Sequence, residues 1–270
     1  MLRSERRAKI LEIIKENGFA EVKKLQELLN VTPLTIRRDL NALGKQNLIK
    51  KTYGGAELVR EEGTSIEPYY ETKFYFNLEK KQAIGKIAVE FINDGDTLII
   101  DNGTTTFQMV LSMKTKNFKN LTILVNDIKI AQELCKIKNL KVILIGGMIN
   151  SQHYSTYGIY ASNILSEIKS NKVFLGIDGL SMENGISCSS LDDGPLKRLM
   201  VQSSKEKIVL ADSSKFNKDV FYKICGWDMI DTVITDEGMP KEYIDFFKNK
   251  NINIKICDSS LIFSSNINAL

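Results

Sequence analysis

The sequence predicts an α/β protein in which an N-terminal winged helix-turn-helix is followed by a mainly parallel α/β domain. Three observations lead to this prediction. The first residues combine amphipathic helical patterns with a basic hairpin, the chain from residue 78 alternates helical and strand patterns, and the positive charge is concentrated at the start. We expect the winged helix-turn-helix over 1–59, a linker over 60–77 and the α/β domain over 78–270.

The charge distribution separates the first domain from the rest of the chain. Residues 1–60 contain 13 Lys or Arg against 7 Asp or Glu, a net charge of +6, whereas the whole chain has only +4. The remaining residues contain 24 basic against 26 acidic side chains and are slightly negative. A basic excess confined to one small domain is expected of a module that binds a polyanion.

The segment NVTPLTIRRDLNAL (30–43) has the pattern of a helix with a polar face. Thr32 is suited to the N-cap, and Pro33 stands at the first helical position, where its missing N–H costs nothing. The apolar positions Ile36, Leu40 and Leu43 recur at i, i+4 and i+7 and form one stripe. The neighbouring arginines lie off that stripe, where a solvated surface is the ordinary interpretation.

The surrounding patterns favour DNA binding over a merely solvated surface. Helical patterns at 6–16 and 22–29 precede the arginine helix, and the basic segment NLIKKTYGGAELV (47–59) predicts a hairpin with a Gly-Gly turn. Three helices and a basic hairpin make a winged helix-turn-helix, whose third helix enters the major groove. Thr35, Arg37 and Arg38 are then placed to contact bases and phosphates, and the wing lysines to contact phosphates.

The string TIRRDLNALGKQNLIKKTYGGAEL resembles the recognition helix and wing of the DeoR family of bacterial transcriptional regulators, with the pattern TIRRDLxxLxxxGxLxRxHGGA. The resemblance covers residues 3–59. Asn47 replaces the usual Gly and Tyr53 the usual His, both in the wing. We expect the partner to be double-stranded operator DNA, contacted by Thr32, Thr35, Arg37, Arg38, Lys45, Lys50, Lys51 and Tyr53.

Residues 60–77 (REEGTSIEPYYETKFYFN) show little apolar periodicity and predict a linker. Their aromatic residues are expected to dock against one domain or a neighbouring subunit; they are Tyr69, Tyr70, Phe74, Tyr75 and Phe76.

From residue 78 the pattern alternates between helix and strand. Apolar strands are predicted at 96–101, 121–126, 141–147, 172–179, 207–213, 232–236 and 252–257, with helical patterns in most connections. This alternation predicts a largely parallel sheet covered by helices.

Small polar or charged residues follow most of these strands, where an ordinary turn would explain any single case. In open α/β sheets a ligand binds outside the carboxyl ends of the strands, so their convergence there favours a small polar ligand. DNGTTT (101–106) is the best anion site, because the helix start offers unpaired N–H groups, although the threonines could simply cap the helix. Asp178 could accept hydrogen bonds from sugar hydroxyls, and Lys197 and Lys215 could bind a phosphate or carboxylate.

The motifs DNGTTT, LTILVND, VILIGG, FLGIDG and VLADSSKF resemble the sensor domain of the same family, which is similar to ribose-5-phosphate isomerase. The resemblance implies that a phosphorylated sugar is the effector. Asp127, Asn150 and Pro195 depart from the family pattern, Pro195 replacing an acidic residue. The implied effector-binding residues are Asp101, Gly103, Thr104, Thr105, Thr106, Asn126, Gly146, Gly147, Asp178, Gly179, Lys197 and Lys215.

The expected function is therefore that of a transcriptional repressor of a sugar or carbohydrate catabolic operon, released from its operator by a phosphorylated sugar. The alternative is a sugar-phosphate isomerase with an accessory DNA-binding domain, in which Asp178 and Lys197 would be acid–base partners. The missing acidic residue at Pro195 and the basic N-terminal module count against it. We expect no catalytic residues and no cofactor.

Composition sets the remaining expectations. No run of about 18 apolar residues occurs, so no membrane span is expected. The four cysteines are far apart and the chain has one histidine, which favours reduced thiols in a cytoplasmic protein and no metal site. Because a single winged helix contacts few base pairs, we expect a homo-oligomer, a dimer or tetramer, held through residues 78–270.

Overall fold

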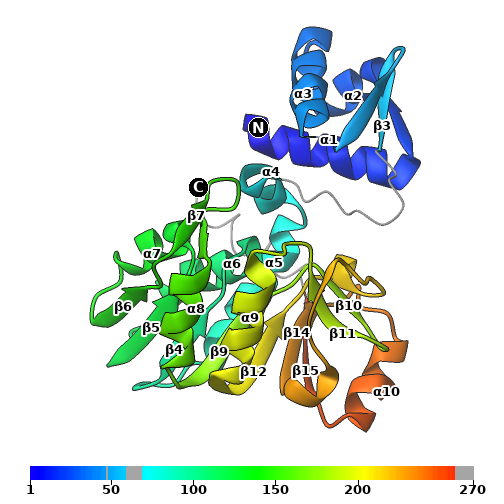
Figure 1. Ribbon diagram of the computed structural model, residues 1–270. Helices are drawn as coiled ribbons and strands as arrows, with labels where there is room; N and C mark the ends of the chain where they lie inside the picture. The colour runs from blue at the N-terminus through cyan, green and yellow to red at the C-terminus, as the bar shows by residue number, and fades with distance from the viewer. Residues whose placement is uncertain (47, 59–68, 259–270) are drawn as a thin grey trace. The chain divides into compact units, whose positions relative to one another are not determined.

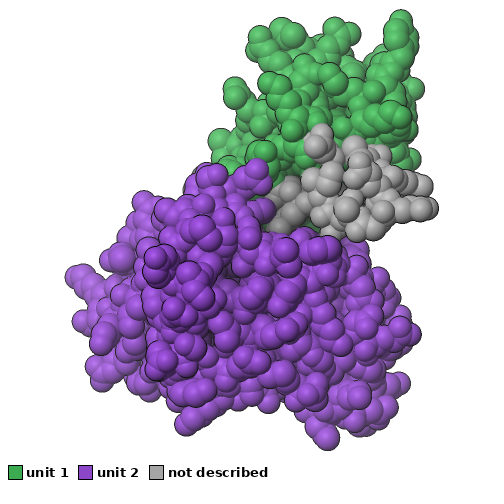
Figure 2. Space-filling view, viewed as in Figure 1, with its two compact units in different colours: residues 1–78 green, residues 79–270 purple. Residues whose placement is uncertain are grey.

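The computed structural model describes residues 1–46, 48–58 and 69–258. The chain divides into two compact units, residues 1–78 and residues 79–270 (Figure 2). Asn47, a family departure noted above, and residues 60–68 of the expected linker lie outside the described residues.

The smaller unit is a winged helix-turn-helix, as predicted. A three-stranded antiparallel sheet in the order β1-β3-β2 packs with the helices, and β2 and β3 form the wing (Figure 1). The elements are α1 (Arg3–Asn17), β1 (Phe19–Glu21), α2 (Val22–Leu29), α3 (Pro33–Lys45), β2 (Ile49–Thr52), β3 (Gly55–Leu58) and α4 (Tyr70–Tyr75).

Helix α3 begins where the sequence predicts. Thr32 has extended backbone angles and its side-chain oxygen accepts a hydrogen bond from the N–H of Thr35 at 3.3 Å. Pro33 occupies the first turn, where no intrahelical donor is needed. The apolar stripe faces the unit's core: Ile36, Leu40 and Leu43 are buried together with Ile10 and Leu25 of the other two helices.

The second half of the segment expected to be a linker contains the helix α4, which the sequence did not predict. Helix α4 packs against α1, and the N–H of Asn77 donates to Glu12 Oε1 at 3.3 Å. Tyr70 is buried, and Phe76 packs against the core of this unit. The helix went unnoticed because its apolar residues are aromatic neighbours without a 3.6-residue period.

The larger unit contains a seven-stranded parallel sheet in the order β15-β14-β12-β9-β4-β5-β6. All seven strands predicted from the sequence are present in it. They are β4 (Thr97–Ile100), β5 (Leu121–Val125), β6 (Leu140–Leu144), β9 (Ser170–Gly176), β12 (Ser204–Leu210), β14 (Thr232–Asp236) and β15 (Asn253–Cys257).

Helices cover both faces of this sheet (Figure 1). Leu98 and Ile100 face one hydrophobic core and Ile99 faces the other, because successive side chains of a strand point to opposite faces. The first core is shared with α5 (Leu78–Ala88), the short 3-10 helix η1 (Val89–Phe91), α6 (Thr104–Met113) and α7 (Ile128–Leu134). The second is shared with α8 (Ile159–Ser166), α9 (Asp193–Gln202) and α10 (Glu242–Asn249).

The larger unit also contains two short antiparallel sheets, which the sequence did not predict. They are the ribbon β7–β8 and the three-stranded sheet β10-β11-β13. Their bounds are β7 (Met148–Asn150), β8 (Ser155–Tyr157), β10 (Gly179–Ser181), β11 (Gly185–Cys188) and β13 (Tyr222–Cys225). In the described parts of the chain, no helix has the length and apolar character needed to span a membrane.

Candidate functional site

Helix α3 separates an apolar side from a charged side. Arg37 and Arg38 are exposed, whereas Ile36 and Leu40 on the same helix are buried. Thr35, in the first turn of α3, is half-buried, and Thr32 is exposed at the N-cap of this helix. The helix therefore presents its N-terminal half to solvent with two cationic side chains, which is the part a winged helix-turn-helix inserts into the major groove.

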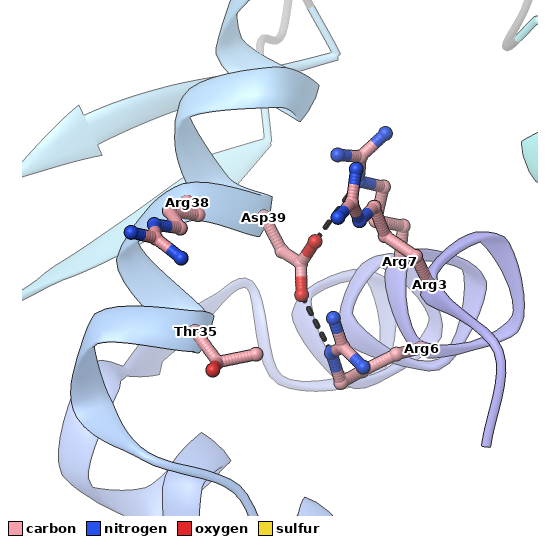
Figure 3. Close-up of a pocket in the computed structure, with 6 residues that line it drawn as sticks. All are labelled: Arg3, Arg6, Arg7, Thr35, Arg38 and Asp39. Carbon is pink, nitrogen blue, oxygen red and sulfur yellow. Dashed lines mark hydrogen bonds and ion pairs between the residues drawn. The ribbon is translucent and has the colours of Figure 1, made fainter.

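The two arginines of α3 border different hollows of the surface. Arg37 lines a hollow of about 460 Å³ together with Tyr53 at the wing tip and Lys23 of α2. Arg38 and Thr35 line a second hollow of about 530 Å³, whose other wall is helix α1 (Figure 3). The exposed part of α3 thus lies between the wing on one side and the N-terminal end of α1 on the other.

Three arginines of α1 belong to this surface and were missed in the sequence. Arg3, Arg6 and Arg7 line the second hollow with Asp39 of α3 (Figure 3). Asp39 is buried, and its two oxygens accept from Arg6 Nε at 2.6 Å and Arg7 Nε at 3.0 Å. A signal was available: Asp39 falls three residues after Ile36, on the buried side of the helix, where a carboxylate requires a charged partner.

The wing places its charged residues at the surface. Lys50 and Lys51 are exposed; Lys51 Nζ donates to Asn41 Oδ1 at 2.8 Å, and Lys50 Nζ lies 3.8 Å from a Glu57 oxygen. Tyr53 is fully exposed at the hairpin tip, next to Gly54, whose φ of +85° suits a tight turn. Lys45 lies at the opposite, C-terminal end of α3.

In the larger unit, polar side chains meet at the carboxyl ends of the central strands. Asp101, directly after β4, accepts from the N–H of Gly176 at 3.0 Å and from the ammonium of Lys197 on α9. The same ammonium donates to Asn102 Oδ1 at 3.3 Å and to the Gly176 carbonyl at 3.1 Å. Asp101 Oδ1 is buried and has no hydrogen-bond partner among the described residues.

This polar cluster includes the predicted Asn126 and extends to Asn102, Ser155 and Asp193, which the sequence did not single out. Asn126 Oδ1, after β5, accepts from the N–H of Asn102 at 2.9 Å. The carboxylate of Asp193 accepts from Asn102 at 3.5 Å and from the hydroxyl of Ser155 at 3.3 Å. We define the carboxyl-edge cluster as Asp101, Asn102, Asn126, Asp127, Ser155, Asp193 and Lys197, all of them buried.

The ionisation of the cluster follows from burial and pairing. Burial raises the pKa of Asp101 to about 6, against the lowering effect of Lys197. Burial alone would lower the pKa of Lys197, but the Asp101 carboxylate raises it above its ordinary value. Both groups are therefore charged at neutral pH. Burial raises the pKa of Asp127 to about 7, opposed by backbone N–H groups of Ile130 and Gly103.

Asp178 lies beside the same cluster. The Oδ2 atom of Asp178 accepts from the N–H of Ser189 at 3.0 Å. Burial raises the pKa of the neighbouring Cys188 thiol to about 12, and the charges acting on it come from Lys197, Asp178, Asp101 and Asp193. The charges of the predicted Asp101, Asp178 and Lys197 therefore all influence this thiol.

The DNGTTT segment forms the start of α6 at the same edge. Gly103, with φ of +144°, precedes the helix, and Thr104, Thr105 and Thr106 are buried in its first turn. The hydroxyl of Thr106 donates to the Gly103 carbonyl at 2.9 Å. Among the described residues, no side chain caps the N-terminus of α6, so the simpler interpretation, in which the threonines cap the helix, is wrong.

Lys215 belongs to a second, basic group at the end of β12. The 3-10 helix η2 (Ser213–Lys215) follows Asp212, whose side chain accepts from the N–H of Ser214 at 3.0 Å. Burial favours a raised pKa for Asp212, but Lys215 and Lys81 lower it below its ordinary value. Burial and the charge of Lys215 lower the pKa of Lys218. The charges of Lys81 and Lys215 therefore act on Asp212, and the charge of Asp212 acts on Lys218.

Two of the three remaining predicted glycines have packing roles. A Cβ at Gly147 would lie 2.4 Å from the Tyr157 carbonyl oxygen, so the ribbon β7–β8 requires glycine there. A Cβ at Gly179 would lie 2.6 Å from the Lys218 carbonyl oxygen, within β10. Gly146 is exposed and has open space around it. Within the described ranges, no group of three or more His, Cys, Asp or Glu side chains could hold a metal ion.

Comparison with known proteins decides the family. Residues 76–237 match the DeoR C terminal sensor domain, and residues 6–62 match the DeoR-like helix-turn-helix domain. The chain belongs to the DeoR family. This DeoR-family protein is accordingly a DNA-binding transcriptional regulator, and its larger unit contains the sensor domain. The family predicted from the sequence is confirmed.

The similarity of this DeoR-family protein to curated regulators extends over nearly the whole length of each relative. It is 33% identical to the putative aga operon transcriptional repressor of Escherichia coli O157:H7, over 93% of each chain. It is 32% identical to the transcriptional repressor GlcR of Bacillus subtilis, over 96% of this chain and 98% of that one. The glycerol-3-phosphate regulon repressor of Escherichia coli K12 is 28% identical, over 95% of this chain and all of its own.

Among solved structures, the DeoR-family protein is similar to ribose 5-phosphate isomerase from Plasmodium falciparum. The likeness covers 50% of this chain and 52% of that chain, at 15% identity and a TM-score of 0.37. It is partial and has no bearing on the site.

Proposed function

We propose that this protein is a repressor of a carbohydrate operon that binds operator DNA through α3 and releases it when a phosphorylated sugar binds at the carboxyl-edge cluster. The relatives named as repressors of the aga operon and of the glycerol-3-phosphate regulon support a carbohydrate target. The protein then acts through two sites in two units, one for the operator and one for the effector.

The observation that carries the effector site is the unpartnered, buried oxygen of Asp101. A buried acceptor without a donor is costly, and a sugar hydroxyl would supply the donor. The start of α6 at Thr104 and the lysines around Asp212 provide N–H groups and positive charge for a phosphate. Hydroxyl recognition by carboxylates and phosphate recognition by cations together describe a phosphorylated sugar.

The state of Lys197 favours binding over catalysis. Its ammonium donates to three acceptors, Asp101, Asn102 and the Gly176 carbonyl, and its pKa is raised. A lysine in this state keeps its proton and cannot act as the general base that an aldose–ketose isomerisation needs. We therefore propose that the sensor domain binds sugar phosphates without converting them.

We further propose that the protein works as a homodimer, since one winged helix contacts too few base pairs for tight specificity. An apolar face on the larger unit supports this: Met148 and Ile149 of β7 and Ile159, Tyr160 and Ile164 of α8 are exposed. Residues 142–166 contain no Asp, Glu, Lys or Arg. In a two-fold interface such a face meets its own copy without facing like charges.

A binding screen tests the effector site. The melting temperature of the full chain is measured against phosphorylated sugars, their unphosphorylated counterparts and inorganic phosphate. A specific effector should raise the melting temperature by binding the native state. Lys215→Ala should weaken that shift, whereas the matched control Lys205→Ala, an exposed lysine at the opposite end of β12, should leave it unchanged.

Two outcomes would contradict the proposal. If no phosphorylated sugar raises the melting temperature of the wild-type protein, the effector class is wrong. If the protein interconverts an aldose phosphate and its ketose isomer with turnover, the non-catalytic role is wrong.

A further inference from the structure

We propose that Arg3, Arg6 and Arg7 of α1, with Arg38 of α3, form a binding site for one phosphate group of the DNA backbone. The inference rests on the DNA-binding function and adds a contact that neither the wing nor the recognition helix supplies alone. It concerns the second hollow described above, of about 530 Å³.

The charge of this hollow calls for an anion. Four guanidinium groups line it, and the one carboxylate that lines it, Asp39, is buried. Arg6 and Arg7 form the ion pairs with Asp39, and within the described residues no ion pair is found for Arg3 or Arg38. Three positive charges therefore remain uncompensated around a concave surface. A phosphate diester carries one negative charge and presents oxygens in the geometry that arginine binds by its fork.

The ion pairs with Asp39 fix the two inner arginines in place. Each pair uses the Nε atom, at 2.6 Å for Arg6 and 3.0 Å for Arg7, so the terminal Nη groups take no part in it. The side chains of both arginines are largely covered. Arginines held in this way lose little conformational freedom when they bind a ligand, whereas a flexible surface arginine loses more. Asp39 thus positions the site and joins α1 to α3.

The position of the hollow selects DNA over a small anion. Arg38 and Thr35 line it from α3, the helix that enters the major groove (Figure 3). A phosphate bound between α1 and that half of α3 would belong to the strand that borders the groove. Arg37 faces the other hollow, toward the wing. The second hollow would therefore bind the DNA backbone on the side of α3 away from the wing. Such a contact carries no sequence information.

The test is the salt dependence of DNA binding by the full chain. Two probes are used: a mixed-sequence duplex, and an operator selected by the wild-type protein from a random-sequence library. Arg3→Gln is the test variant because it leaves the Asp39 pairs intact. Lys9→Gln is the matched control, since it removes one positive charge from the same helix outside the hollow.

Arg3→Gln should lower affinity for both duplexes by the same factor and reduce the slope of log K against log salt by about 0.9, the value for one phosphate contact. Lys9→Gln should leave the slope unchanged. Thermal melting of both variants should match the wild type, which excludes a folding defect.

Equal slopes for Arg3→Gln and Lys9→Gln would overturn the phosphate site, and so would a loss confined to the selected operator, because a base contact would then be the cause. Tight binding of inorganic phosphate by the full chain, abolished in Arg3→Gln while DNA affinity is unchanged, would assign the hollow to a free anion instead. If wild-type protein selects no sequence and binds neither duplex, the DNA-binding function itself fails, which is a separate result.

Discussion

At the scale of single residues, buried carboxylates differ in what compensates them. Asp39 pairs with two arginines, and Asp101 pairs with Lys197. Asp193 lies one turn before Lys197 on α9 and raises its pKa, so a carboxylate is present near that lysine although Pro195 replaces the acidic residue of the family pattern. Burial raises the pKa of Asp127 to about 7, although backbone N–H groups of Ile130 and Gly103 lower it. This last carboxylate should make stability depend on pH.

The change Asp127→Asn tests this dependence. Because the folded-state pKa of about 7 lies above the ordinary value of 3.8, the native state binds a proton that the unfolded state has lost between these pH values. The stabilisation from that proton is present at low pH and is lost as pH rises toward 7. Asparagine keeps the N-cap of α7 but cannot titrate. The free energy of unfolding in urea, measured at pH 5 and pH 8, should fall less with pH in the variant.

The control for this prediction is Asp245→Asn, an exposed carboxylate on α10. Its pH dependence should follow the wild type. An identical pH dependence in Asp127→Asn and wild type would show that Asp127 titrates as an ordinary carboxylate.

At the scale of elements, the strands of the parallel sheet were predictable because they are buried on both faces and therefore appear as continuous apolar runs. Helix α3 was predictable because cap, proline and apolar stripe agree. The short strands β7 and β10 (MIN and GLS) contain no periodic signal; tertiary packing determines them. The carboxyl-edge residues were found from strand ends. Asn102 and Asp193 were not singled out, because their side chains join the cluster through hydrogen bonds between segments far apart in the sequence, such as the 91 residues that separate these two.

The wing offers a prediction at this scale. A Cβ at Gly55 would lie 2.4 Å from the carbonyl oxygen of Ala20, where β3 packs against β1. Gly55→Ala should therefore destabilise the smaller unit by about 1–3 kcal/mol, the usual range for overpacking. Gly44→Ala is the matched control: it lies in α3, its Cβ would meet atoms at 3.8 Å or more, and alanine favours the helix.

Thermal melting of the two glycine variants checks this. The melting temperature should fall for Gly55→Ala and should stay level or rise for Gly44→Ala. A melting temperature for Gly55→Ala equal to the wild type would mean that β1 and β3 are not packed as described.

At the level of the whole molecule, the proposed function requires a dimer, a DNA-binding surface and a sensor domain whose ligand changes DNA affinity. A substitution on the apolar face of β7 and α8 tests the proposed dimer interface. Tyr160→Asp places a charge opposite its own copy and should raise the dimer dissociation constant at least about tenfold, as loss of a central contact does. Light scattering over a dilution series measures this. Phe221→Asp, equally exposed and outside the face, should assemble like the wild type.

A wild-type protein that is monomeric at micromolar concentration would contradict the proposed dimer. If Tyr160→Asp assembles like Phe221→Asp, the interface lies on another surface.

In the proposed mechanism, one chain couples sugar-phosphate binding to operator release, and an operator titration with and without the effector measures this coupling. The effector is the best ligand from the thermal screen, and the proteins are wild type, Lys215→Ala and Lys205→Ala. A coupling free energy of about 1–3 kcal/mol would weaken operator binding of the wild type and of Lys205→Ala by roughly 5–150-fold. Lys215→Ala should bind the operator as tightly as wild type and respond far less to the effector. If no phosphorylated sugar changes the operator affinity of the wild-type protein, the proposed coupling is wrong.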